Sequence, residues 1–369
     1  MVSSSSGAPL LAIYVSGHGF GHSTRTAEVL RAVRERAPEL PIAVTTSAPS
    51  FLFEGVVAPP LELRPVAGDV GLVQHDALVI DEEGTAAAWR VYVSGWDARV
   101  AAEAVWLRRS GAWLVLGDIP PLAFAAAAAA GLPSVALGNF SWDWIYRHLG
   151  RRVPALNAAA DWAADAYRHA GTLLRLPFAG DLRVFREIED VPLVARQPRV
   201  GRTEARRRLG LDGVAVLLSF GGAGWPGLRL AALGRLTQYV FLATGATGGG
   251  GLPGNARRLD GAMLAAAGLE YPDLVAAADV VVTKPGYGIV TDCIGARTRL
   301  VYTDRGDFPE YPILAAQIGQ YLPAVFASNE EIREGRLETA LATVLGRAFP
   351  DRPRMDGAAV SAEALLGRL

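Results

Sequence analysis

The chain has 369 residues, of which 51% are hydrophobic and 20% are charged, and its formal net charge is -1. This composition is typical of a globular protein and excludes a mainly disordered one. The length suits two domains of about 150 to 200 residues each. Because the net charge is close to zero and no stripe of Lys and Arg stands out, we expect no nucleic acid as a partner.

Cysteine content and apolar runs bear on the cellular compartment. Cys293 is the only cysteine, so no disulfide can form within the chain and no thiolate metal cluster can be built. Residues 1–9 are polar and lack the basic start and apolar stretch of a signal peptide, and the alanine-rich run 122–131 is too short to span a bilayer. We expect a cytoplasmic protein without a transmembrane segment, and the sequence leaves its oligomeric state open.

Short apolar runs rich in β-branched residues alternate with stretches of helical period along most of the chain. This alternation is typical of βα repeats around a parallel sheet. The strands predicted in the first half are 10–16, 42–47, 61–66, 113–118 and 134–139, and those predicted in the second half are 214–220, 239–244, 280–283 and 299–303. One long helix is predicted over 85–109, with its aromatic side chains in the core, and the glycine-rich run 245–254 is predicted to be a flexible loop.

Residues 191–201 have the character of a linker between two domains. They contain two prolines and show no strong periodicity. We predict an N-terminal domain over 1–194 and a C-terminal domain over 195–369, each with its own βα series. The last helix is able to pack back on the N-terminal domain.

The first glycine motif, SGHGFGHSTR at 16–25, follows the first predicted strand and opens a helix. Its glycines allow close backbone approach, and His22 falls near the helix N-terminus, a position that favours a neutral imidazole and hence a general base. The alternative is that His18 and His22 are a structural pair that caps a tight turn, and which of the two is the base stays open. No acidic strand end follows about 20 residues later, which argues against a dinucleotide site.

Asp118 ends a buried predicted strand in the segment LGDIPP. An acid at this edge of the sheet can orient His22 and stabilise the imidazolium that forms when the histidine takes a proton. The alternative is an N-cap for the helix that starts after Pro121.

Two further segments of the second half, one rich in glycine and one acidic, also follow predicted strands. In SFGGAGW at 219–225, the backbone amides of Gly221 and Gly222 can approach a phosphate. Residues 304–312, DRGDFPEYP, carry Asp307 and Glu310, which suit sugar hydroxyls but are equally ordinary in an acidic surface loop.

The segment TKPGYGIVTDCIG at 283–295 reads as a strand, a glycine turn and a helix. The first amides of that helix can hold a diphosphate, and Lys284 can add a point charge. Asp292 lies further along the helix and can accept hydrogen bonds from ribose hydroxyls. The alternative is that Lys284 and Asp292 are a solvated pair near the helix start.

Together these segments resemble the glycosyltransferase-like N-terminal region of plant L-arabinokinases and its stand-alone bacterial relatives. The resemblance covers nearly the whole chain and is carried by GHGFGHSTR, the stretch 116–146 with NFSWDWIY, RLP at 175–177, DVPLVAR at 190–196, SFGG and KPGYG. More distantly, the plan is similar to UDP-dependent GT-B enzymes, including bacterial cell-wall N-acetylglucosaminyltransferases. The resemblance implies an α/β fold of the GT-B type, with two Rossmann-like βαβ domains that face each other across a cleft.

The resemblance also implies roles for single residues. The N-terminal domain would be the acceptor side, where His22 matches the glycine-flanked base and Asp118 its partner. The C-terminal domain would bind the nucleotide sugar, with Asp292 at the position of an acid, usually glutamate, that contacts ribose. The acidic pair after the next strand maps to Asp307 or Glu310. No phosphate loop of a sugar kinase is present, so phosphorylation of arabinose is not expected.

We therefore expect a glycosyltransferase, of hexosyl or pentosyl type, that moves a sugar from a nucleotide-sugar donor to a small-molecule acceptor. A UDP-sugar is the leading donor, and inversion follows from the resemblance. Independence of metal is expected because no DxD-type motif stands at a suitable strand end, and no cofactor is expected. The expected donor contacts are Gly19, Gly21, Gly221, Gly222, Lys284, Gly286, Tyr287, Gly288, Asp292, Asp307 and Glu310.

Several alternatives stay open at this point. The same fold serves nucleotide-sugar 2-epimerases and hydrolases, and a non-catalytic nucleotide-sugar-binding module is a further possibility. The sugar, the acceptor and the stereochemistry are not indicated by the residues. Phe140, Trp142 and Trp144 can line an acceptor site for a flat molecule or can be buried.

Overall fold

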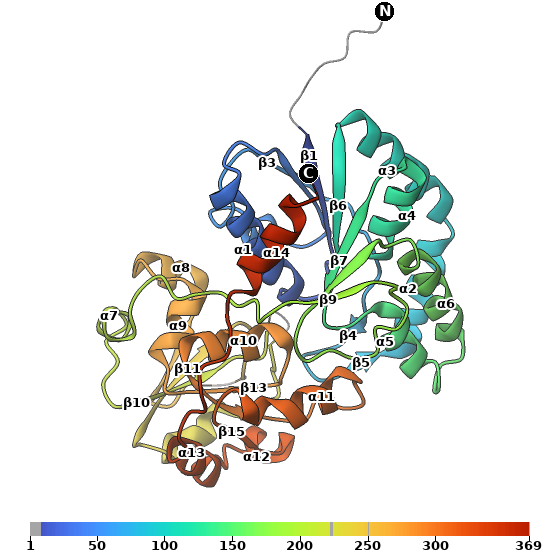
Figure 1. Ribbon diagram of the computed structural model, residues 1–369. Coiled ribbons are helices and arrows are strands. Elements are labelled where there is room, and N and C mark those ends of the chain that lie inside the picture. The colour runs from blue at the N-terminus through green and yellow to red at the C-terminus, as the bar shows by residue number, and fades with distance from the viewer. Residues whose placement is uncertain (1–8, 222–223, 250, 369) are drawn as a thin grey trace, which may run out of the picture. The chain divides into compact units, whose positions relative to one another are not determined.

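The computed structural model describes the chain except for residues 1–8, 222–223, 250 and 369. The described residues form two compact units (Figure 1). The first is drawn from Met1–Val73, Asp81–Val194 and Arg354–Leu369, and the second from Gln74–Ile80 and Ala195–Pro353. Each unit therefore contains segments that are far apart in the sequence.

The first unit contains a seven-stranded parallel sheet in the order β3-β2-β1-β6-β7-β8-β9. Its strands are β1 Leu10–Val15, β2 Ile42–Thr45, β3 Leu61–Arg64, β6 Ala112–Asp118, β7 Ser134–Gly138, β8 Thr172–Arg175 and β9 Ile188–Asp190. The strands predicted from the first half of the sequence are present, with ends that differ by one or two residues. The short strands β8 and β9 were not predicted.

Helices cover this sheet, and its inner strands β1, β6 and β7 are buried because parallel sheets carry their connections on both faces. They are α1 Gly21–Arg36, α2 Glu82–Val93, α3 Trp96–Arg109, α4 Pro121–Ala130, α5 Trp142–Leu149, α6 Ala155–Tyr167 and α14 Gly357–Leu366, with a 3₁₀ turn, η1, at Ser50–Leu52. The C-terminal helix α14 packs against α1, and the two lie side by side in Figure 1. All residues of β1 are buried.

The prediction of one helix over 85–109 was wrong. The chain forms α2 and α3 instead, and Gly95 is the residue before the first turn of α3. Glycine is a weak helix former, so the helix breaks there at little cost. The break lets the ring of Trp96 meet the ring of Trp162 edge-on, with 4.9 Å between their centroids. Trp96 is half-buried, which agrees with the packing role expected for it.

The second unit contains a six-stranded parallel sheet in the order β12-β11-β10-β13-β14-β15. Its strands are β10 Val214–Leu218, β11 Tyr239–Thr244, β12 Ala256–Leu259, β13 Val280–Thr283, β14 Arg299–Tyr302 and β15 Ala324–Phe326. The strands predicted for this half are present, whereas β12 and β15 were missed. In both units the order runs out from the first strand and then back to its other side, as in a Rossmann fold.

The connecting helices of the second unit are mostly short. They are α7 Arg202–Arg208, α8 Gly261–Ala266, α9 Tyr271–Ala277, α10 Tyr287–Ala296, α11 Glu310–Gln317, α12 Asn329–Arg333 and α13 Glu338–Leu345, with 3₁₀ turns η2 Leu230–Arg235 and η3 Ile318–Gln320. The predicted glycine-rich loop after β11 is irregular in its described part. The guanidinium of Arg258 donates hydrogen bonds to the carbonyls of Gly245, Thr247 and Gly248, which holds the start of this loop in one path.

Residues 74–80 belong to the second unit although they come from the first half of the sequence. The short strands β4 Val73–Gln74 and β5 Ile80–Asp81 pair with each other on either side of this segment. Ala77 is buried in the apolar core of the second unit, and its amide donates a hydrogen bond to the carbonyl of Gly224. The carboxylate of Asp76 accepts from the amides of Leu78 and Val79, which fixes the turn.

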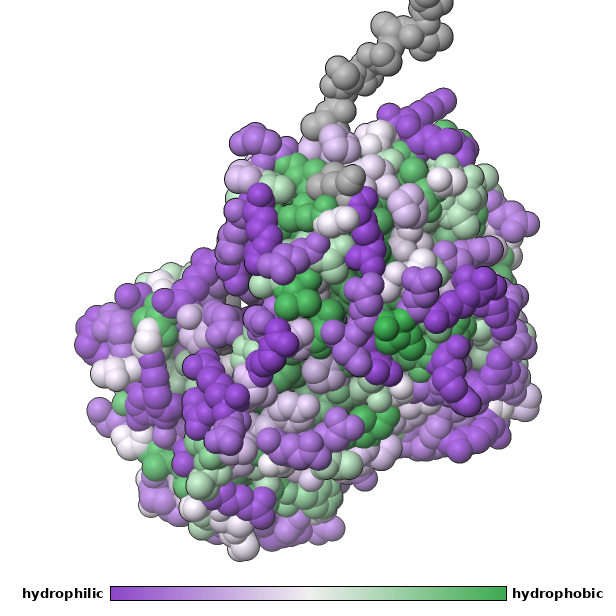
Figure 2. Space-filling model, in the orientation of Figure 1, coloured by the Kyte–Doolittle hydropathy of each residue, from purple (hydrophilic) through white to green (hydrophobic). Residues whose placement is uncertain are grey.

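Hydrophilic residues cover much of the face seen in Figure 2, and apolar residues lie between them. Within the part of the chain that the structure describes, no helix has both the length and the apolar character needed to cross a membrane.

Candidate functional site

Both sheets reverse their strand order beside their first strand. In the first unit the reversal lies between β1 and β6, and in the second between β10 and β13. Ligands of open parallel sheets bind outside the carboxyl ends of the strands at such a point. The four motifs that follow β1, β6, β10 and β13 in the sequence therefore meet in pairs, one pair at the reversal point of each sheet.

The glycines after β1 shape the loop that carries His22. Gly17 lies so close to Ser47 that an added Cβ would be 2.0 Å from the Ser47 Oγ, and Gly19 has a φ of +69°, which side chains rarely adopt. Gly21 opens α1, and an added Cβ there would meet nothing within 4 Å. The loop thus places His22 in the first turn of α1, at the carboxyl end of β1.

His22 and Asp118 are in direct contact. The Nδ1 atom of His22 lies 2.8 Å from Oδ1 of Asp118, and the exposed fractions of the two residues are 5% and 0%. The ring of His22 also meets the rings of Phe140 and Trp142, with centroid distances of 5.3 and 6.4 Å. Phe140 and Trp142 are themselves buried, so they form walls around the histidine.

The carboxylate of Asp118 also forms hydrogen bonds with Arg25 and Thr26. Arg25 donates to it from Nε at 2.7 Å and from Nη2 at 2.5 Å, and the hydroxyl of Thr26 donates at 2.8 Å. Burial alone would raise the pKa of Asp118, but the charges and hydrogen bonds of Arg25 and His22 lower it to about 2. Arg25 also donates to Oδ1 of Asn139 at 2.7 Å, and its Nη2 lies 3.1 Å from Nδ1 of His22. Asp118 is therefore a carboxylate shared between a histidine and an arginine.

A second buried carboxyl group, Asp69, lies in the same cluster. The indole Nε1 of Trp142 donates to its Oδ2 at 2.8 Å. Burial raises the pKa of Asp69, although hydrogen bonds from Ser16 and Trp142 and the proximity of His22 oppose the rise. The cluster thus combines one carboxyl group with a low pKa and one with a raised pKa.

His18 occupies a different environment from His22. Its Nδ1 accepts a hydrogen bond from the amide of Leu72 at 3.2 Å, and its ring meets Trp142 edge-on at 5.3 Å. Two large apolar side chains near the start of α1 are exposed instead of buried. Phe20 and Phe51 have exposed fractions of 41% and 60%, and their ring centroids are 6.0 Å apart.

In the second unit, the features that suit phosphate binding are a glycine turn after β10 and a helix start after β13. Gly221 follows the end of β10 with a φ of +76° and is exposed, and Gly222 lies outside the described residues. Helix α10 starts at Tyr287 after Gly286, with Gly288 in its first turn and no side chain that caps it. Helix starts of this kind present backbone N–H groups to anions.

Lys284 does not lie with its amine in open solvent. Its Nζ donates to the carbonyl of Ala77 at 2.6 Å. Burial, followed by the charge of Arg305, lowers the pKa of Lys284 to about 7, with Asp76 and Glu310 opposing the shift. The ammonium is thus held against a backbone carbonyl of the segment 74–80.

Asp292 is buried and paired with an arginine. Arg196 donates to it from Nε at 3.2 Å and also from Nη2, and the exposed fractions of the two side chains are 23% and 2%. The guanidinium of Arg196 lies over the ring of Tyr271, 4.9 Å from its centroid. The Tyr271 hydroxyl in turn shares a hydrogen bond of 2.7 Å with the hydroxyl of Ser219, which follows β10.

The two candidate acidic residues after β14 differ in burial. Glu310 is buried at the start of α11 and accepts from Nη1 of Arg305 at 2.6 Å. Asp307 is exposed in the preceding loop.

Sequence reasoning missed several residues of these clusters. Arg25 and Arg196 stand inside quoted motifs, GHSTR and DVPLVAR, and their positions in those motifs were the available signal. Asn139, the first residue of NFSWDWIY, has the same signal, whereas Asp69 and Tyr271 have none, because they reach the clusters from a loop and a helix of other βα repeats.

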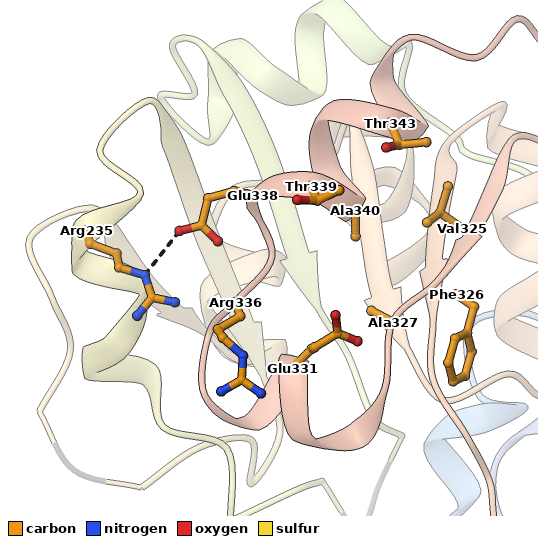
Figure 3. Close-up of a pocket in the computed structure, with 10 residues that line it drawn as sticks. All are labelled: Arg235, Val325, Phe326, Ala327, Glu331, Arg336, Glu338, Thr339, Ala340 and Thr343. Carbon is orange, nitrogen blue, oxygen red and sulfur yellow. Dashed lines mark hydrogen bonds and ion pairs between the residues drawn. The ribbon is translucent and has the colours of Figure 1, made fainter.

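A surface depression of about 540 Å³ lies elsewhere on the second unit, between β15, α12, α13 and η2. Figure 3 shows Arg235 and Glu338 joined by an ion pair beside it, with Val325 and Phe326 on the strand side. It shares no residue with the clusters at the strand ends. Within the described residues, no group of three or more His, Cys, Asp or Glu side chains is arranged to hold a metal ion.

No family model matches the chain. The chain is 34% identical to the L-arabinokinase of Arabidopsis thaliana over 363 residues, which are 96% of this chain and 34% of that protein. It thus spans about a third of the length of the curated relative it matches.

Solved structures share the fold at low sequence identity. The glycotransferase of kitacinnamycin aligns with a TM-score of 0.66 at 15% identity, over 98% of this chain and 99% of that one. Phytolacca americana UGT2, complexed with UDP-2-fluoroglucose and pterostilbene, aligns with a TM-score of 0.61 at 13% identity, over 97% of this chain and 93% of that one. The chain therefore has the GT-B fold of these glycosyltransferases and is similar, over nearly its whole length, to about a third of L-arabinokinase.

Proposed function

We propose that the chain is a glycosyltransferase that moves a sugar from a UDP-sugar to a small-molecule acceptor, with inversion at the anomeric carbon and without a bound metal. The observation that carries the proposal is the contact of His22 with Asp118 at the reversal point of the first sheet. A buried histidine with an ionised carboxylate at Nδ1 is the arrangement of a general base.

The proton balance of His22 supports this role. Because the pKa of Asp118 is about 2, the carboxylate is ionised at neutral pH and can only accept hydrogen bonds. A neutral His22 that donates from Nδ1 to Asp118 carries its lone pair on Nε2. Nε2 then takes the proton of the acceptor hydroxyl while the hydroxyl oxygen bonds to the anomeric carbon and the diphosphate leaves.

The donor would bind at the strand ends of the second unit. The start of α10 after Gly286 and the exposed turn at Gly221 offer backbone amides that can stabilise the charge of the leaving diphosphate. The choice of UDP is supported by Phytolacca americana UGT2, a protein of the same fold whose structure contains a UDP-sugar analogue. The exposed pair Phe20 and Phe51 supports an acceptor with an apolar or aromatic part.

One observation favours a second function, a nucleotide-sugar-binding module without catalysis. Nη2 of Arg25 lies 3.1 Å from Nδ1 of His22, so Arg25 competes with His22 for Asp118 and can donate to the same ring nitrogen. If Nδ1 of His22 accepts a hydrogen bond from Arg25, the ring proton is on Nε2. Nε2 then has no free lone pair and cannot act as a general base. The two functions therefore differ in whether His22 contributes to turnover.

The test combines binding and turnover. Calorimetry with UDP, TDP, GDP and ADP identifies the donor nucleotide, and release of the nucleotide from its sugars is then followed with a panel of phenols and monosaccharides as acceptors. His22→Ala is expected to lower kcat by about 10² to 10⁴ without weakening nucleotide binding. His148→Ala, a histidine on α5 outside the cluster, serves as the matched control.

Three results would contradict the proposal. Failure of all four nucleotides to bind would leave a GT-B scaffold with another ligand. Binding without turnover by any acceptor would favour the non-catalytic module. Equal turnover by wild type and His22→Ala would remove the histidine from the mechanism.

A further inference from the structure

The two side chains of the ion pair between Arg196 and Asp292 differ in their exposure to solvent. The Asp292 side chain is 2% exposed and lies on α10, whereas the Arg196 side chain is 23% exposed and comes from the segment that precedes α7. A ligand that approaches from solvent therefore meets the guanidinium before the carboxylate. If the Arg196 side chain moved away, the buried carboxylate of Asp292 would lose its partner, which is energetically costly. Asp292 therefore holds the guanidinium of Arg196 in place.

The contacts of Arg196 also show where it lies relative to the strands of the second sheet. Its guanidinium lies over Tyr271, whose hydroxyl meets Ser219 at the end of β10, while Asp292 belongs to the helix that follows β13. Thr244, the last residue of β11, donates to the same Ser219 hydroxyl at 3.2 Å. Arg196 is thus tied to both strands that flank the reversal point of the second sheet, where ligands of such sheets bind.

Two other cations near these strand ends, Lys284 and Arg305, are less exposed or less fully charged than Arg196. Lys284 donates to the carbonyl of Ala77, and its lowered pKa of about 7 leaves it only partly charged at neutral pH. Arg305 also pairs with a buried carboxylate, that of Glu310, but its side chain is 13% exposed, compared with 23% for Arg196. Guanidinium groups stay charged at all physiological pH values and bind phosphate oxygens through a planar set of N–H groups.

We propose that Arg196 is the residue that binds the diphosphate of the nucleotide-sugar donor, and that Asp292 is a positioning residue that holds Arg196 instead of a direct ligand of the ribose. The inference rests on the proposed function and assigns the cationic contact of its donor site. It differs from the role that the sequence suggested for Asp292 and from the role suggested for Lys284.

The experiment compares UDP with uridine by calorimetry on the full chain. The variants are Arg196→Gln, Asp292→Asn and the double variant, because uridine keeps the base and ribose but lacks the diphosphate. We expect Arg196→Gln to weaken UDP binding at least about tenfold, the scale of one lost charge-assisted contact, while uridine binding changes little. We expect Asp292→Asn to weaken UDP less, and the double variant to bind UDP as Arg196→Gln does, since Asp292 acts through Arg196.

The control is Arg199→Gln, which removes an arginine three positions along the same segment whose ion pair with Glu270 is exposed. It is expected to leave both affinities unchanged. The double variant also guards against misfolding, because it removes both members of the buried pair and leaves no unpaired charge. Thermal unfolding of each variant identifies any loss that is only structural.

Each other outcome overturns the inference in a distinct way. Equal weakening of uridine and UDP by Asp292→Asn, with losses that add in the double variant, would make Asp292 a direct ribose ligand. UDP binding by Arg196→Gln at wild-type strength would remove Arg196 from the site while the proposed function stands. Wild type that binds neither UDP nor any other nucleoside diphosphate would remove the proposed function itself.

Discussion

Replacement of Asp118 by Asn is the sharpest test of the cluster in the first unit. The substitution keeps the shape of the side chain but removes a charge that is completely buried. Arg25, whose side chain is 3% exposed, then loses its carboxylate partner, and Nδ1 of His22 faces a neutral amide instead of a carboxylate. We expect a large loss of stability in the first unit together with a loss of turnover.

Two routes give the magnitude of the stability loss. The shift of the Asp118 pKa from 3.8 to about 2 corresponds to roughly 2 kcal/mol of stability at neutral pH. Because this pKa is lowered by folding, the contribution is present above the unfolded value of 3.8 and is lost as the pH falls through about 2. The substitution also leaves a buried arginine unpaired, so we expect a total loss of about 3 to 5 kcal/mol.

Urea unfolding followed by tryptophan fluorescence measures this loss. Of the 8 tryptophans, only Trp225 belongs to the second unit, so the signal reports mainly on the first. The control is Arg25→Met combined with Asp118→Asn, which removes the unpaired charge and should recover part of the lost stability. An Asp118→Asn variant with the wild-type midpoint, or losses that simply add in the double variant, would refute the reasoning.

Three further predictions concern single contacts. Asp69→Asn should raise the free energy of unfolding at neutral pH, with the gain vanishing near pH 3.8, because folding raises the pKa of Asp69 and so disfavours its charged form; urea titrations at the two pH values measure this. Gly17→Ala should cost about 1 to 3 kcal/mol through the clash with Ser47, and Ser47→Ala should relieve most of it, as thermal unfolding of the single and double variants will show. The stability of the second unit should rise with pH between about 7 and 10.5, because folding lowers the pKa of Lys284. Lys284→Met should flatten this rise in thermal unfolding scans at the two ends of that range.

Local patterns were sufficient for most of the sheet and for the glycine turns. Most of the buried strands, such as β1 and β13, were predicted because each is a run of β-branched and apolar residues of strand length. Gly17 and Gly19 were singled out by their place after β1, and the structure gives each a physical need, the approach to Ser47 and a positive φ. Short strands such as β9, whose residues are all exposed, have no apolar run and were missed.

The alternation of strands and helices, and the positions at which glycines interrupt it, can be predicted from the sequence because both depend on neighbours along the chain. Which charged groups meet depends on how the strands are ordered in space. Asp118 contacts His22 and Arg25 because β6 lies beside β1, and Asp292 meets Arg196 rather than solvent because α10 packs near the segment before α7. Lys284 meets the carbonyl of Ala77 because residues 74–80 join the second unit. These pairings depend on strand order and on chain crossings between repeats, and no periodicity in the sequence encodes them.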